Sequence, residues 1–124
     1  MPPRRRTDPG LGRRALDAWR TGTATPRETT TAVRFTLESL AAAAPGSSVE
    51  VRVPPSGVVQ CVQGPRHTRG TPPNVVETDP ATWLALVIGG VTWREALADG
   101  RLRASGERAD LSELLPMRFS TLDR

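Results

Sequence analysis

The sequence of 124 residues contains no Lys and no Tyr, and only one Cys and one His. A single cysteine, Cys61, excludes an intrachain disulfide. One Cys and one His also fall short of the usual zinc ligand set, so we expect no metal. No Gly-rich loop matches a phosphate or dinucleotide fingerprint, so we expect no cofactor. The longest apolar run, Trp83 to Ile88, is far too short to span a bilayer.

The basic residues are all Arg, which gives a net charge of +4 and a sequence pI of about 11.1. Guanidinium groups stay protonated far above neutral pH, so this charge hardly titrates. Codon bias in a GC-rich genome would account for the Arg richness and for the many Ala, Pro and Gly residues, and selection for phosphate binding is the less favoured alternative. Without the terminal run Arg4 to Arg6 the chain is nearly neutral, and we therefore expect no nucleic-acid partner.

The N-terminal segment carries charge, but Arg13 and Asp17 interrupt the stretch that follows, so it lacks the apolar centre of a secretory signal. We therefore expect a cytoplasmic protein without stable membrane insertion. The first helix could lie on a membrane surface, but docking onto the body is the expected role of its apolar stripe. The expected organisation is a flexible basic tail (1–7), a single domain (8–117) and a C-terminal tail (118–124).

Helix signals occur at five places. Asp8-Pro9 and Asp79-Pro80 each pair an N-cap with Pro at the first helical position. Residues 25–28 and 92–95 have the Thr-x-x-Glu pattern of a capping box. The stop signals are Gly22, Pro45-Gly46, Gly89-Gly90 and Gly100. A last helix is expected to carry Leu111, Leu114 and Leu115 and to end at Pro116.

The remaining segments have the pattern of strands. Val49 to Val53 alternates apolar and charged residues, and a Pro-Pro-Ser-Gly turn leads to a second strand at Val58 to Val62, which predicts an antiparallel hairpin. Asn74 to Glu77 and Arg101 to Ser105 predict two further strands. Because helices and strands occur in blocks, the chain is expected to be α+β, with a layer of helices on a largely antiparallel sheet.

Two polar features of the sequence are candidate functional sites. Cys61 and His67 could form a nucleophile and base, but a thiol in an apolar strand is usually buried and inert, so we expect no enzymatic activity. Around His67, Arg66 and Arg69 could clasp a carboxylate or phosphate headgroup. The simpler interpretation of the same loop is a solvated Arg-rich surface, because loops are usually polar and exposed.

The helices that carry Trp83 and Trp93 leave a second question open. Apolar stripes at helical spacing are typical of a packed core, yet they also line ligand cavities. The Gly89-Gly90 joint between the two helices would permit relative movement, as a cavity wall needs.

The segment Asp79–Leu115 resembles the second half of sterol-carrier-protein type 2 domains. The resemblance rests on a helix, a Gly break, a Glu-Ala helix, a Gly-bounded strand and a closing Ala-Asp-Leu helix. Over residues 8–117 the chain is similar to small actinobacterial proteins of the sterol carrier family. It shares with them the segments VEVRVPP, QCVQGPRHTRGTPPNVVETDPATWL and ASGERADLSELLP.

The resemblance implies a sheet of about five strands, helices over one face, and an apolar tunnel for a sterol, fatty acyl or isoprenoid-like lipid. We therefore expect a non-catalytic carrier. The alternative is an interaction or homodimerisation module of the same fold whose core is filled. The residues expected to line the tunnel are apolar: Leu37, Trp83, Leu84, Val87, Trp93, Leu97, Leu111, Leu114 and Leu115.

Overall fold

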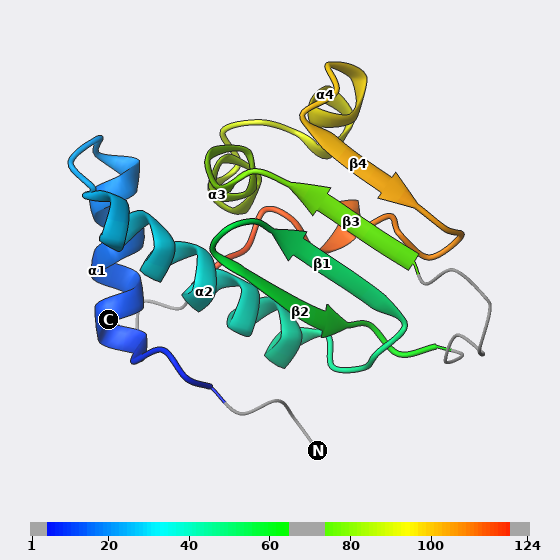
Figure 1. The fold of residues 1–124 in the computed structure, drawn as a ribbon, viewed down its shortest axis with the longest axis horizontal. Coiled ribbons are helices and arrows are strands. Elements are labelled where there is room, and N and C mark those ends of the chain that lie inside the picture. Colours follow the sequence, from blue (N-terminus) through cyan, green and yellow to red (C-terminus); the bar gives the residue numbers. More distant parts are fainter. Residues whose placement is uncertain (1–4, 65–73, 120–124) are drawn as a thin grey trace.

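The computed structural model describes residues 5–64 and 74–119, which form four α-helices and one sheet (Figure 1). The helices are α1 (Pro9–Arg20), α2 (Pro26–Ala43), α3 (Pro80–Ile88) and α4 (Trp93–Ala98). The strands are β1 (Val49–Val53), β2 (Gly57–Cys61), β3 (Asn74–Thr78) and β4 (Leu102–Ser105). None of these helices is long and apolar enough to cross a membrane.

Each α-helix begins at the cap that the sequence predicts. Asp8 and Asp79 accept hydrogen bonds from the backbone N–H groups of Leu11 and Thr82, at 2.9 and 2.8 Å. Both capping boxes are complete, with the Thr side chain and the Glu side chain each closing one hydrogen bond. These local hydrogen bonds satisfy donors that the first helical turn leaves unpaired.

The sheet has the strand order β2-β1-β3-β4. β1 and β2 form the predicted antiparallel hairpin, with Val49 opposite Cys61, and β3 pairs with β4 antiparallel. The central pair, β1 and β3, is parallel. The described residues form four strands, so the expectation of about five, which came from the resemblance, needs correction. The four strands expected from residue patterns are the four observed.

The expectation of a closing helix through Leu111 and Leu115 is wrong. The structure has a single 3-10 turn there, η1 (Ser112–Leu114), and Leu115 is extended with φ −126° and ψ 142°. Pro116 disfavours helical backbone at the residue before it, so the segment is too short to complete an α-helix.

Helices cover one face of the sheet, which agrees with the expected α+β architecture (Figure 1). The side chains of Val49, Val51 and Val53 are buried against the helices, whereas Arg52 is exposed on the other face. α2 lies along β2, so closely that a Cβ placed on Gly57 would be 3.3 Å from Leu37 Cδ1. This layer between α2, α3 and the sheet is the core.

α1 docks onto α2 through its apolar stripe, as expected. Ala15 and Leu16 are buried, and Gly12 lies directly against the Phe35 ring. The chain before α1 also contacts α2: Thr7 donates two hydrogen bonds to Glu38, from its backbone N–H at 3.0 Å and from its hydroxyl at 3.2 Å.

Candidate functional site

The first apolar groove lies between α4 and the edge strand β4 and has a volume of about 660 Å³. Trp93 and Leu97 form one wall, and Ala104 and Ala109 form the other. Leu97 is 42% exposed and lies beside the almost completely buried Trp93 in this lining. The groove therefore offers an apolar surface that the rest of the described chain does not cover.

A second groove, of about 470 Å³, lies where the end of α2 meets the C-terminal segment. Val62 on one side and Leu111 and Leu114 on the other give it an apolar floor, and Arg108 and Gln63 lie at its polar rim. Val62 has φ +67°, a left-handed conformation that a β-branched residue rarely adopts.

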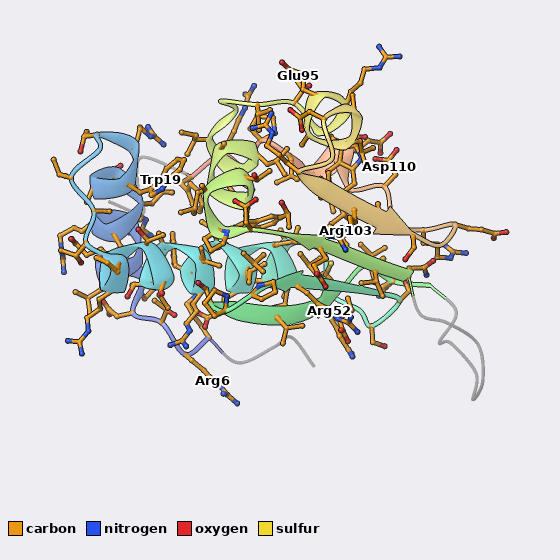
Figure 2. The ribbon with its side chains drawn as sticks, turned by 45° about the horizontal axis from the view of Figure 1, so that its top comes forward. Arg6, Trp19, Arg52, Glu95, Arg103 and Asp110 are labelled. Atoms are coloured by element: carbon orange, nitrogen blue, oxygen red, sulfur yellow. The ribbon has the colours of Figure 1, made fainter. Side chains whose placement is uncertain are left out.

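The two grooves share Asp110, which Figure 2 labels, and the segment 106–114 contributes residues to the lining of both. This segment contains no α-helix and no strand. The Asp110 carboxylate accepts a hydrogen bond from the Ser112 N–H at 2.9 Å, which holds the pKa of Asp110 below its ordinary value. The Arg108 N–H donates to Asn74 Oδ1 at 3.1 Å. One of these two hydrogen bonds joins the segment to β3, and the buried side chains of Ala109 and Leu111 hold it against the core.

The residues of α3 occupy a different environment. Trp83, Leu84 and Val87 are fully buried. The indole Nε1–H of Trp83 donates to Thr36 Oγ1 at 2.8 Å, and the Thr36 hydroxyl is within hydrogen-bond distance of the Ala32 carbonyl at 2.8 Å. Trp83 is thereby fixed between α2 and the sheet and fills core space.

The nine residues expected to line one tunnel are therefore distributed over the domain. Trp93 lies with Leu97 in the first groove, and Leu111 with Leu114 in the second. Leu37 lines a further groove of about 600 Å³ between α2 and β2. Leu115 is half-buried against the core beside the three buried α3 residues.

Cys61 is buried, and desolvation raises the pKa of its thiol to about 11. A thiol with this pKa is almost entirely protonated at neutral pH and therefore a poor nucleophile. His67, with Arg66 and Arg69, lies outside the described residues. Residues 5–64 and 74–119 contain no cluster of three or more His, Cys, Asp or Glu side chains that could hold a metal ion.

The sequence analysis missed Asn74, Arg108 and Asp110. Asn74 joins three segments: its Nδ2 donates to the Ser48 carbonyl at 2.8 Å, and its Oδ1 accepts from Arg108. These partners are distant in the sequence, so no local pattern signals them. Only Asp110 had a local signal in the sequence: an Asp side chain often accepts a hydrogen bond from the backbone N–H two residues later, which predicts a turn there.

Comparisons with known proteins agree with this architecture. No curated protein is similar enough to the chain to count as a relative. The family model described as "Bacterial SCP ortholog" matches residues 26–117, which include the sheet, the buried α3 and both grooves. α1 and Phe119 lie outside the matched residues. Since the match covers most of the chain, the protein belongs to the family of bacterial SCP orthologues, within the sterol carrier proteins.

Proposed function

We propose that the protein is a cytoplasmic, non-catalytic carrier of an apolar small molecule: a fatty acyl, sterol or isoprenoid-like lipid. The apolar part of the ligand lies in the two grooves on either side of residues 106–114. The observation that carries this proposal is that two grooves with apolar side chains in their linings share Asp110 and are both lined by the segment 106–114. Each groove falls within the range of roughly 300–1,000 Å³ typical of ligand sites.

The energetics favour a chain-like ligand. Burial contributes about 0.8 kcal/mol for each methylene. A fully buried chain of sixteen carbons therefore gains roughly 13 kcal/mol, which is comparable to the upper end of the cost of association, roughly 4–15 kcal/mol. A small movement of residues 106–114 would join the grooves and lengthen the apolar surface available to the chain. The predicted lining residues Trp93, Leu97, Leu111 and Leu114 would then contact one ligand.

The contacts with the polar headgroup of the ligand are proposed from the sequence alone. Gln63 lines the second groove, and the Arg66–Arg69 loop begins a few residues later. Arg66, His67 and Arg69 would bind a carboxylate or phosphate at the polar end of the ligand. Arg108, at the rim of the same groove, would add a fourth positive or hydrogen-bonding side chain there.

The test is a titration with a fatty acid, monitored by Trp fluorescence. Leu97→Asp places a charge in the first groove at an exposed position, so it should fold normally and weaken binding about tenfold or more. The matched control is Leu11→Asp on α1, where the leucine is 56% exposed and lines neither groove. A titration without saturable change, together with no lipid in native mass spectrometry, would reject the carrier function.

A second function, an interaction or homodimerisation module, is favoured by one specific observation. The exposed Leu97 lies beside β4, an edge strand, and a partner chain could cover both. Sedimentation distinguishes the two functions. A tight dimer that Leu97→Asp dissociates, with no extractable lipid, would support the module instead of the carrier.

A further inference from the structure

A smaller pocket, of about 200 Å³, lies on α1. It shares no lining residue with the two grooves of the proposed function. Both of its walls lie outside residues 26–117, the part of the chain that matches the family. The lining of the pocket is Gly10, Arg13, Arg14, Leu16, Asp17, Arg20 and Phe119.

The apolar wall of this pocket is firmly built. Phe119 stacks on Phe35 of α2, with ring centroids 5.4 Å apart. Gly12 lets α1 approach the same Phe35 ring, because any Cβ there would collide with it. Leu16 is buried below. Packing on both sides thus fixes the distance between α1 and the Phe119 ring.

The polar wall carries an excess of positive charge. Arg13, Arg14 and Arg20 line it, and Asp17 is the one carboxylate among the lining residues. The Nε atom of Arg13 is buried and has no hydrogen-bond partner within the described chain. A buried donor of a charged group without an acceptor is costly, and a small shift of the Arg13 side chain would let this donor reach an acceptor oxygen in the pocket.

A second carboxylate, Asp8, lies close to Arg14, since a Cβ on Gly10 would lie 3.2 Å from Asp8 Oδ2 and 3.5 Å from an Arg14 amino nitrogen. Asp8 Oδ2 accepts the Leu11 N–H as the N-cap of α1 and keeps its negative charge, so it offsets part of the positive charge of Arg14. The pocket lining itself keeps an excess of two positive charges, from three guanidiniums and one carboxylate.

We propose that the α1 pocket binds a phosphate monoester. A phosphate monoester carries close to two negative charges at neutral pH, which matches the excess charge of the lining. Its three terminal oxygens suit planar guanidinium groups, which donate paired hydrogen bonds. The volume has room for the phosphate and a small apolar group against Leu16 and Phe119, and it excludes a whole lipid. This inference is independent of the proposed carrier function.

The test is isothermal titration of the full chain with phenyl phosphate. Saturable binding is expected, and phenyl sulfate, a monoanion of similar shape, should bind more weakly. Arg13→Gln and Arg20→Gln should each weaken phenyl phosphate binding about tenfold, since one charge-assisted hydrogen bond contributes about 1.5–3 kcal/mol. The matched control is Arg103→Gln, because Arg103 is exposed on β4, away from α1 (Figure 2).

Circular dichroism confirms that each variant is folded. Saturable binding that is lost in the α1 variants and kept in Arg103→Gln supports the site. No saturable binding, equal affinity for phenyl sulfate, or equal losses in all variants overturns it.

The source of the phosphate is resolved by competition. Vesicles of phosphatidylcholine, with and without phosphatidic acid, are added to the complex with phenyl phosphate. Displacement only by vesicles that contain phosphatidic acid identifies a lipid phosphate. Retention of phenyl phosphate in both cases identifies a soluble monoester.

Discussion

α3 and α4 are neighbours in the chain, joined at Gly89-Gly90, yet the fold uses them in opposite ways. Each begins at a capping side chain, Asp79 or Thr92, and each carries a Trp near its start. α3 lies between α2 and the sheet with its large side chains fully buried, whereas α4 lies beside the edge strand β4 and leaves Leu97 exposed. The same local rules thus produce one helix whose large side chains fill the core and one that leaves an apolar side chain exposed at the edge of the sheet.

The difference follows from the position of each helix against the sheet. A helix over the centre of a sheet is enclosed by neighbours on several sides, so its burial contributes directly to stability. A helix at the edge has a neighbour on one side only, and its outer apolar residues remain available to a ligand or partner. Substitutions in α3 should therefore lower stability strongly, whereas substitution of the exposed Leu97 in α4 should affect the proposed binding more than stability.

The largest effect is expected from Trp83→Ala. Removing a fully buried indole leaves a cavity and should lower the free energy of unfolding by about 3–5 kcal/mol. Trp93→Ala should cost less, because Trp93 lies at the groove surface and its surroundings can relax. Urea unfolding measures both variants. Equal losses would show that α4 is as much a part of the core as α3.

A smaller loss is expected from Thr36→Val. The substitution keeps the shape of the side chain but leaves Trp83 Nε1–H buried without an acceptor, which should cost about 1–3 kcal/mol. The control is Thr31→Val on the same helix, whose hydroxyl bonds only to the Arg27 carbonyl in an exposed position. If Thr36→Val loses no more stability than Thr31→Val, the hydrogen bond between Trp83 and Thr36 does not stabilise the core.

The caps allow a direct comparison of the two helices. Asp79→Ala and Thr92→Ala each remove an N-cap and should each cost about 1 kcal/mol. The loss at Asp79 should be the larger, because its carboxylate also accepts the Thr82 hydroxyl at 2.8 Å. Thermal unfolding ranks the two variants. A larger loss in Thr92→Ala would contradict the expectation that α3 contributes more to stability than α4.

The smallest effect on stability at neutral pH is expected from substitution of Cys61. Its contribution to stability should instead change at alkaline pH. Its folded pKa of about 11 exceeds the ordinary value of 9.0, so folding favours the neutral thiol. The resulting stability is fully present below about pH 9 and is lost as the pH rises toward 11. Because the chain has neither Lys nor Tyr, no other side chain titrates strongly in this window.

Urea unfolding at pH 8 and pH 10 tests this expectation. The native protein should lose stability between the two, and Cys61→Ala should lose less. Thiol labelling of the folded protein at neutral pH should also be slow. Rapid labelling would show that the thiol is accessible and would reopen a nucleophilic role for Cys61.

Much of the fold could be predicted because its signals are local. A cap acts on the first turn of its own helix, and the β1–β2 hairpin is specified by alternation and a short turn. The parallel pairing of β1 and β3 was missed because it joins segments far apart in the chain. The sequence predicted a closing helix because the Leu residues before Pro116 have helical spacing. The prediction was wrong because the residue before a proline disfavours the helical conformation, and only a 3-10 turn forms.

The candidate site was predicted only in part, for a similar reason. Trp83 and Trp93 have the same apolar character in the sequence, and the pattern of each helix is consistent with either core or cavity wall. Whether each Trp is enclosed depends on the residues that pack against it. For Trp83 these include residues of α2, and for Trp93 they belong to β4 and the segment 106–114. Asn74 and Arg108 meet for the same non-local reason.

The sequence by itself determined the helix starts, the hairpin, the family and the absence of Lys and Tyr that isolates the Cys61 titration, because each depends on residue identity or on near neighbours. The tertiary structure alone decided that α3 fills the core, that α4 borders an open groove, and that three arginines of α1 meet Phe119 around one pocket. Burial is a property of what packs against a side chain, and that is fixed only when distant segments come together.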